Sequence, residues 1–318
     1  RDGRHTGPRR AGLHALFGEA NLAPGKVNSH TIGFVIGPRL NAAGRLGSAR
    51  VGYDLLLSPT PESARPLAAE LGELNRQRQV MTRQFVEQAR EMLAALENVP
   101  YLSFIAGEDF HPGVVGLVAG RLAEELYRPA VVAEIGPDET RGSCRSIPEF
   151  NITSALDDCR DLLIRHGGHA AAAGFTLKNE HLPELRRRLE AIAGEKLQGL
   201  DLAPTLRIDA ELDLADLDFA VCGRLAELEP HGEANPQPVF AAHGVNVARD
   251  SVRLVGREGQ HLKMRVKAPG SSTEWDAIGF GMGALAGSLA GKLDLAYSID
   301  VNDYSGRPQL TLRDLREA

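Results

Sequence analysis

The sequence predicts an α/β protein with a separate β-barrel at its C-terminal end. Over residues 100–198, strand and helix patterns alternate, as in a compact α/β domain. A helical pattern runs without interruption over residues 63–97. Residues 199–318 hold short apolar runs that are separated by Gly, Pro, Asn and Asp, which favours a small Greek-key barrel of the OB type.

Composition excludes several classes of protein. The chain has 318 residues, of which 43% are hydrophobic and 25% charged, as in ordinary globular proteins. Its three cysteines form no C-x-x-C motif and cannot all pair, so we expect no disulfide framework and a reducing, cytoplasmic setting. No apolar run of about 18 residues occurs, so we expect no membrane span. With a net charge of -6, any nucleic-acid binding must be focused in a groove.

Helices and one short strand are expected in the first third of the chain. Residues 11–20 have a helical pattern, and residues 29–36 form an apolar run that predicts a buried strand. The helix over residues 63–97 would begin with Ser63 as its N-cap and reach roughly 50 Å. It serves either as a strut between two domains or as one arm of a helical hairpin. Its motif LNRQRQ contains Arg76, a candidate DNA contact.

The ten residues GPRLNAAGRL, 37–46, predict a tight loop, because two glycines and a proline interrupt regular structure. This loop would present Arg39, Asn41 and Arg45 together. Guanidinium and amide groups in such a loop suit phosphate contacts. The alternative is an arginine-rich surface loop held by ion pairs, and the pattern leaves both interpretations open.

The middle of the chain predicts a further set of strands and helices. Strands are expected over residues 101–106 and 129–134, and helices over residues 111–125 and 182–197. His111 would lie at the N-terminus of the first of these helices, on the same side as the neighbouring loops. It is a candidate phosphate contact there, or a helix cap.

Residues 141–176 carry the densest group of candidate binding residues. In a strand-like run, Ser143, Arg145 and Ser146 place two hydroxyl groups beside one guanidinium. A helix is expected to follow, with apolar residues at helical spacing from Ile152 to Leu163.

Two adjacent glycines, Gly167 and Gly168, can end that helix. They can also point backbone N–H groups at an anion, while His169 and Arg145 add charge-assisted hydrogen bonds. The stretch is therefore either a phosphate pocket or a helix C-cap with a packed histidine, and spacing alone does not decide.

The C-terminal barrel is expected to contain seven strands and one short helix at residues 284–290. The strands are predicted over residues 206–214, 239–248, 251–255, 261–268, 273–280, 293–301 and 309–312. Three aromatic residues in this region, Trp275, Tyr297 and Tyr304, are candidates for stacking on bases.

Six motifs in order, GPRLNAAGRL, LNRQRQ, FHPGVVGLVAGRL, GSCRSIPEFNI, HGGHAAAAGF and LEPHGEANPQPVF, resemble the RecJ family of single-strand-specific 5′→3′ exonucleases. This family belongs to the DHH phosphodiesterase superfamily, and the resemblance covers essentially the whole chain. It implies the C-terminal part of a DHH domain (1–60), a connecting helix (61–98), a DHH-associated α/β domain (99–199) and an OB domain (200–318).

The resemblance gives catalytic roles to Arg39, Arg45 and His169, which match motifs that face the scissile phosphate. The candidate residues for binding DNA and its 5′-phosphate are Asn41, Arg76, His111, Ser143, Arg145, Ser146, Gly167 and Gly168. Cys144 stands where the family usually has Ala or Gly.

The resemblance also implies two divalent ions, Mn2+ or Mg2+, held by Asp-rich motifs and an Asp-His-His motif. Neither occurs in this sequence, so we expect the ligands in a region that precedes these residues. This chain alone is then expected to be a monomer that binds single-stranded DNA without cleaving it. A single-stranded-DNA-binding protein and a helicase are candidate partners.

Two other functions remain open. One is a replication scaffold that binds DNA without chemistry. The other is a DHH phosphodiesterase that acts on short oligonucleotides or cyclic dinucleotides.

Overall fold

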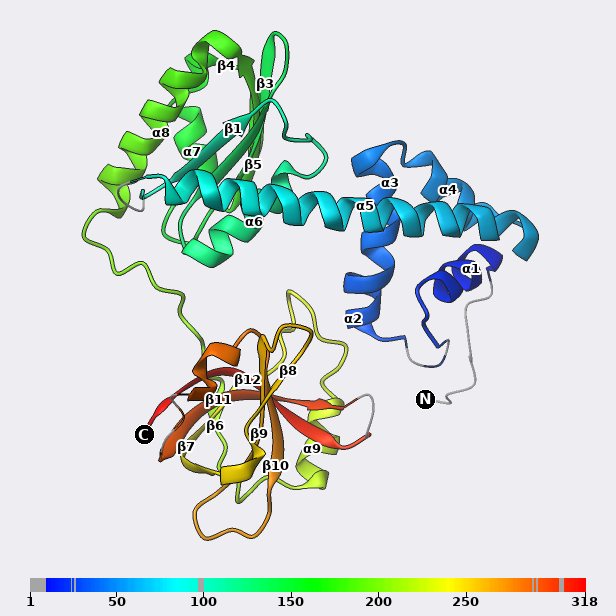
Figure 1. The fold of residues 1–318 in the computed structure, drawn as a ribbon, viewed down its shortest axis with the longest axis vertical. Helices are drawn as coiled ribbons and strands as arrows, with labels where there is room; N and C mark the ends of the chain where they lie inside the picture. The colour runs from blue at the N-terminus through cyan, green and yellow to red at the C-terminus, as the bar shows by residue number, and fades with distance from the viewer. Residues whose placement is uncertain are drawn as a thin grey trace. The chain divides into compact units, whose positions relative to one another are not determined.

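The computed structural model describes residues 10–23, 25, 27–96, 100–287, 289, 291–302 and 306–318. The chain divides into two compact units, one that ends at Pro204 and one that begins at Thr205. The first contains a group of helices, one long helix and a five-stranded sheet, and the second is a β-barrel (Figure 1). None of the described helices is both long enough and apolar enough to cross a membrane.

The chain begins with short helices that pack against the long helix α5 (Pro61–Ala94). They are α1 (Ala11–Glu19), α2 (Ser29–Thr31), the π-helical turn η2 (Ile32–Ile36), α3 (Gly37–Leu46) and α4 (Arg50–Leu57). Leu16, Leu55 and Leu71 are fully buried where these helices meet α5.

The strand expected over residues 29–36 is wrong, because the segment is helical. The side chain of Asn28 accepts a hydrogen bond from the Thr31 N–H at 2.9 Å, and the Thr31 hydroxyl accepts one from the Asn28 N–H. This capping box starts a helix. The apolar run is also not buried as a strand would be, since the Phe34 side chain is 74% exposed.

The loop expected at GPRLNAAGRL is also wrong, because these residues form α3. Pro38 lies in the first turn, where its missing N–H costs little. Ala42 and Ala43 are fully buried on the other side of the helix. Tertiary packing of these alanines outweighs the low helix propensity of the glycines.

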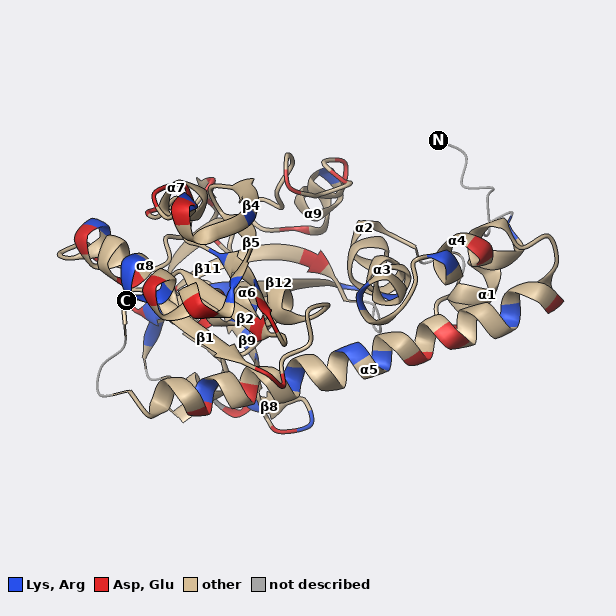
Figure 2. Ribbon diagram, turned by 90° about the horizontal axis from the view of Figure 1, so that it is seen from above, with Lys and Arg blue, Asp and Glu red and all other residues tan. Residues whose placement is uncertain are grey.

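The long helix α5 confirms the prediction over residues 63–97 with a shifted start. Thr60 is the N-cap, and Ser63 completes the capping box as the third helical residue. Its first half packs on α1, α3 and α4, and its last turns pack Val86 and Ala89 against the sheet region. The helix is therefore a strut, not an arm of a hairpin. Basic and acidic residues are interspersed along its length (Figure 2).

The five-stranded sheet has the order β1-β2-β3-β5-β4, with β1 and β2 parallel and the other pairs antiparallel. The strands are β1 (Ser103–Gly107), β2 (Ala130–Ile135), β3 (Glu139–Arg145), β4 (Leu163–His169) and β5 (Ala172–Lys178). The helices α6 (Val115–Leu126) and α5 cover one face, and α7 (Ile152–Asp157) and α8 (Leu182–Leu197) cover the other (Figure 1).

The helix expected from Ile152 to the Gly167-Gly168 pair is wrong beyond its first turns. It ends at Asp157, and after a short 3-10 turn the chain enters β4. The pair therefore lies inside a strand and is not a helix C-cap. The apolar residues at helical spacing are still buried, because the turn continues into the same core.

The second unit confirms the predicted barrel. Its sheet has the order β6-β7-β11-β12-β10-β9-β8, and an additional pairing between β7 and β9 closes it. The strands are β6 (Ala210–Glu211), β7 (Phe240–Val247), β8 (Arg253–Val255), β9 (His261–Lys267), β10 (Trp275–Gly279), β11 (Lys292–Val301) and β12 (Pro308–Glu317).

Two local predictions for the barrel were wrong. The strand expected over residues 206–214 shrinks to β6, because Leu206 and Ile208 are exposed and not packed. The short helix expected near residue 284 is a 3-10 turn, Gly283–Gly287. A helix that the sequence pattern did not indicate, α9 (Phe219–Ala226), lies before β7.

Candidate nucleic-acid interface

The candidate site lies on the face of β3, β5 and β4 that α6 covers only in part. Side chains alternate along a strand, and directly paired residues share a face. Strand pairing therefore places nine residues here in three cross-strand rows: Arg141–Thr176–Arg165, Ser143–Gly174–Gly167 and Arg145–Ala172–His169. We name them the Thr176 row, the Gly174 row and the Ala172 row after their central residues.

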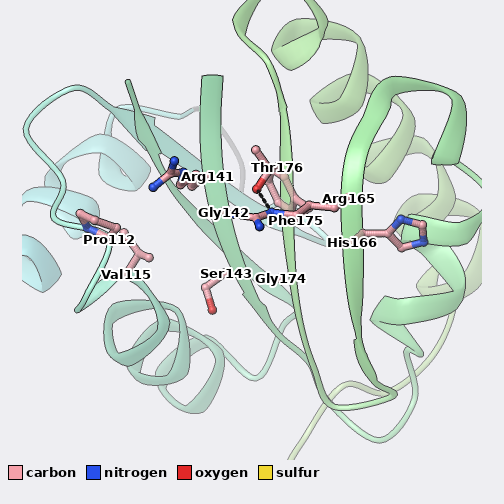
Figure 3. Close-up of a pocket in the computed structure, with 10 residues that line it drawn as sticks. All are labelled: Pro112, Val115, Arg141, Gly142, Ser143, Arg165, His166, Gly174, Phe175 and Thr176. Carbon is pink, nitrogen blue, oxygen red and sulfur yellow. Dashed lines mark hydrogen bonds between the residues drawn. The ribbon is translucent and has the colours of Figure 1, made fainter. Parts of the chain in front are cut away.

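A pocket of about 340 Å³ opens between this face and the start of α6. It is lined by Pro112, Val115, Arg141, Gly142, Ser143, Arg165, His166, Gly174, Phe175 and Thr176. Figure 3 shows the His166 ring turned away from Arg141 and Ser143. Its Nε2 lies 2.8 Å from the Asp157 carboxylate on the other side of the strand.

The N-terminal end of α6 lies directly over Ser143. A Cβ atom at Gly116 would come within 2.9 Å of the Ser143 Oγ and 3.2 Å of the Arg145 Nη2, so a side chain here would displace both groups from their positions under the helix. No side chain caps the first turn of α6. The N–H groups of Val115 and Leu117 donate to the carbonyls of His111 and Val114. Because a helix N-terminus carries partial positive charge, this end of the pocket still favours an anion.

Arg145 is the half-buried cation of the site. Its Nη1 donates to the Ser143 Oγ at 3.2 Å and to the Cys144 carbonyl at 2.7 Å. Burial lowers the pKa of Arg145, and the nearby charge of Arg45 lowers it further. An anion bound beside Arg145 would offset both effects.

Arg45 connects the helical region to the pocket. Its Nη1 donates to the Gly113 carbonyl at 3.1 Å, just before α6. Its charge also lowers the pKa of Arg78 on α5, for which burial is the larger cause. Arg78 donates to the Asn75 side-chain oxygen at 3.0 Å and 3.2 Å. Guanidinium groups from α3, α5 and β3 therefore lie near one another.

These arginines lack acidic partners. Across the described ranges, Arg45, Arg78, Arg141, Arg145 and Arg165 form no ion pair with a carboxylate. Seven arginines on helix surfaces do form such pairs: Arg50, Arg76, Arg90, Arg121, Arg186, Arg187 and Arg188. The charges of these seven are neutralised locally, whereas the arginines of the site keep their positive charge.

Gly167 lies on the pocket face of β4, and the adjacent Gly168 faces the other side, where its partner Ala173 is buried. A Cβ atom at Gly167 would meet nothing within 4 Å, so the fold does not require glycine there. At Gly168 the φ angle is +155°, and a Cβ would lie 2.2 Å from the Ala172 carbonyl oxygen. Glycine at 168 is thus needed by the backbone, whereas glycine at 167 leaves the surface open for a ligand.

Arg39 lies apart from this group. Its Nη1 donates to the Val35 carbonyl at 2.9 Å, and its buried Nε has no hydrogen-bond partner. Burial lowers the pKa of Arg39, and Glu19 partly offsets this. Arg76 is ion-paired with Glu19 at 2.9 Å and with Glu73 at 3.0 Å. Arg39 and Arg76 therefore have Glu19 as a neighbour.

Three other candidates have local contacts or are simply exposed. The Ser146 hydroxyl donates to the Phe150 carbonyl at 2.5 Å. His111 lies before α6, not in its first turn, and its Nδ1 accepts from the Gly113 N–H at 3.0 Å. Asn41 is exposed on α3. The structure therefore places Ser143, Arg145, Gly167, Gly168 and His169 on paired strands, with Arg45 near Arg145, and of the predicted residues only Ser143 lines the pocket.

The prediction that Trp275 and Tyr297 of the barrel stack on bases is wrong, because both side chains are buried. Tyr297 is fully buried and donates from its hydroxyl to the Leu212 carbonyl at 2.8 Å. Trp275 is only 6% exposed, so neither ring face is open to a base. Tyr304 lies outside the described residues. The exposed barrel aromatics are Phe219 and Phe280.

Arg78, Arg141 and Arg165 were missed by the sequence prediction. Arg141, Ser143 and Arg145 recur at two-residue spacing, which predicts one face of a strand. Arg165, Gly167 and His169 have the same two-residue spacing. It was not interpreted as one face of a strand, because a helix was expected over these residues.

Cys144 faces away from the pocket and is fully buried in the opposite core. Burial raises the pKa of its thiol to about 12, despite the neighbouring Arg145. We expect slow labelling of Cys144 by a thiol reagent at pH 8 in the native chain and fast labelling in denaturant.

The Cys144 thiol ionises at a lower pH in the unfolded chain than in the native chain. The stabilisation that the neutral, buried thiol gives the native state is therefore fully present below about pH 8.5 and is lost as pH rises towards 12. A Cys144→Ala variant should lack this decline in the free energy of unfolding, as measured by urea titrations at several pH values. The prediction would be contradicted if the free energy of unfolding fell with pH equally in the variant and in the parent chain.

No group of three or more His, Cys, Asp or Glu side chains that could hold a metal ion occurs among the residues the structure describes.

Two family models match the chain. The DHHA1 domain matches residues 98–195, and the RecJ OB domain matches residues 208–314. The single-stranded-DNA-specific exonuclease RecJ of Bacillus subtilis is 34% identical over 311 residues, which cover 96% of this chain and 39% of the relative. The protein of the same name from Escherichia coli is 32% identical, with 96% of this chain and 54% of the relative covered.

The fold is similar to that of RecJ from Thermus thermophilus in complex with Mn2+. The TM-score is 0.81 at 29% identity, over 98% of this chain and 44% of that one. A second structure of that protein contains Mg2+. The chain thus spans about half the length, or less, of the relatives it matches. From the two domain matches, the relatives and the common fold, the chain belongs to the RecJ family.

Proposed function

We propose that this chain is the part of a single-strand-specific 5′→3′ exonuclease of DNA repair and recombination that binds DNA and its 5′-phosphate. The observation that carries the proposal is the group of arginines without carboxylate partners around the Gly167 floor and the N-terminal end of α6. Relatives named as exonucleases specific for single-stranded DNA support it.

In this proposal the 5′-terminal phosphate lies on the Gly174 row. Arg145, which already reaches Ser143, donates charge-assisted hydrogen bonds to the phosphate oxygens. Gly167 and Gly174 let the phosphate approach the backbone closely. His169, one row further, then contacts the next phosphate of the strand, and Arg45 stabilises negative charge near it.

We further propose that two divalent ions, Mn2+ or Mg2+, are ligated by a region N-terminal to these residues, as the resemblance implies. The residues that the structure describes do not fit such a site, since they include no suitable cluster of ligands. The chain alone would then bind single strands without releasing nucleotides. Metal-dependent nucleotide release by the purified chain, with its mass verified, would contradict this.

The test is fluorescence anisotropy with labelled single-stranded oligonucleotides that carry a 5′-phosphate or a 5′-hydroxyl, at one salt concentration. Tighter binding of the phosphorylated strand is the expected result. Equal binding of the two strands would mean that the chain holds DNA without reading its end, which would favour a scaffold. Failure to bind anything longer than a few bases would favour a phosphodiesterase of short oligonucleotides.

Arg39→Ala is expected to weaken binding of all single strands alike, and to reduce the slope of log K against log salt by about one unit. The reason is that Arg39, although close to Glu19, is not fully neutralised by it. Arg50→Ala is the matched control, because Arg50 is paired with Asp54 at 2.8 Å on the neighbouring α4. A salt slope that is the same for Arg39→Ala, Arg50→Ala and the parent chain would place Arg39 off the DNA path.

A further inference from the structure

The Thr176 row places two arginines and a buried threonine beside the pocket, and the proposed function does not use them. Arg165 donates from its Nε to the Thr176 Oγ1 at 3.1 Å, and this contact fixes its guanidinium over the sheet (Figure 3). Thr176 is only 4% exposed and gives this contact a fixed acceptor, whereas the Arg165 side chain is exposed. Arg141, from the other neighbouring strand, borders the same pocket.

No carboxylate forms an ion pair with Arg141 or Arg165 within the described parts of the chain. Glu134 lies opposite Arg141 in the β2–β3 pairing and so on the same face of the sheet, yet the two form no ion pair. The Asp157 carboxylate binds His166 on the opposite side of β4. Two guanidinium groups therefore face one pocket with their hydrogen-bond donors largely free for a ligand.

The position of the row relative to the proposed 5′-phosphate decides what it can bind. Neighbouring rows are two residues apart on each strand, or roughly 6.6 to 6.8 Å. The Ala172 row lies on one side of the Gly174 row, and in the proposed function its His169 contacts the next phosphate of the strand. A strand whose 5′-phosphate lies on the Gly174 row would continue in that direction. The Thr176 row then lies beyond the 5′ end, where a monophosphorylated strand has no atoms.

We propose that Arg141, Arg165 and Thr176 bind the phosphates beyond the first one at a 5′-polyphosphorylated end, such as the β- and γ-phosphates of a 5′-triphosphate. The inference rests on the proposed function, because the first phosphate must occupy the Gly174 row. Two guanidinium forks match the oxygen geometry of such phosphates. The N-terminal end of α6, whose Val115 borders this pocket, adds favourable potential for the same charge.

The experiment compares oligonucleotides of one sequence that carry a 5′-hydroxyl, a 5′-monophosphate or a 5′-triphosphate, by anisotropy in EDTA at fixed salt. We expect the triphosphate to bind about 10-fold tighter than the monophosphate, as one added charge-assisted contact would give. Arg141→Ala and Arg165→Ala should each reduce this gain and leave the preference for monophosphate over hydroxyl. Arg187→Ala, an ion-paired arginine on α8, is the matched control and should change neither.

Two further arms separate the site from general attraction to charge. A strand with the same added phosphates at its 3′ end should show no Arg141-dependent gain. Free tripolyphosphate that bound as tightly as the 5′-triphosphate strand would show that the row binds polyphosphate without a strand, and would overturn its assignment to a 5′ end.

The two proposals fail differently. A 5′-triphosphate that binds no tighter than the monophosphate, while the monophosphate is preferred over the hydroxyl, would overturn the inference and leave the proposed function standing. Absence of any preference for the monophosphate would overturn the proposed function itself. Thermal melting of both variants checks folding, which should hold because neither residue is part of a buried core.

Discussion

Arg145→Ala is expected to weaken binding of 5′-phosphorylated single strands by about 1.5 to 3 kcal/mol, the range for hydrogen bonds to charged groups. Binding of 5′-hydroxyl strands should change far less. The effect should be large because Arg145 is half-buried under α6 and touches Ser143, and because no carboxylate among the described residues pairs with it and would compete with the phosphate. Anisotropy titrations with the two strand ends measure the difference directly.

Arg188→Ala provides the control for Arg145→Ala. Arg188 lies on α8, on the opposite face of the sheet, and is ion-paired with Glu184 and Asp161 at 2.8 Å. Its removal should leave both strand ends bound as before. If Arg145→Ala weakened hydroxyl and phosphate ends equally, Arg145 would be a general backbone contact and the pocket would not read DNA ends.

The overall architecture could be predicted because its main elements leave long periodic patterns of apolar residues in the sequence. The helix α5 and the barrel strands have many residues at one spacing, and local errors shift only their ends. Short segments behave differently. The run at residues 29–36 is as apolar as a buried strand, and only the contact between Asn28 and Thr31 shows that a helix starts there.

For the candidate site as well, part of the prediction was possible from the sequence, and the local structure was not. Motif resemblance identified Ser143, Arg145 and His169, although the local structure around His169 was predicted as a helix end. Pairing between β4 and β5 makes that segment a strand, and such pairing is not visible in a local pattern. Without the strand, the alternation that joins Arg165 to this face could not be recognised.

The two adjacent glycines should respond to alanine in opposite ways. Gly168→Ala is expected to lower the free energy of unfolding by about 1 to 3 kcal/mol, because its φ of +155° is strained for a side chain. The new Cβ would also lie 2.2 Å from a backbone oxygen of Ala172, which cannot move without disturbing β5. Urea or thermal unfolding of the variant measures the loss.

Gly167→Ala should leave the free energy of unfolding within about 0.5 kcal/mol of the parent, because its Cβ would meet no protein atom within 4 Å. The same methyl group would occupy the floor of the Gly174 row, so binding of 5′-phosphorylated strands should weaken while hydroxyl ends are less affected. Each variant thus serves as the control for the other. If Gly167→Ala bound phosphorylated ends as tightly as the parent, no ligand would approach the backbone there, and the phosphate would have to lie elsewhere on the sheet.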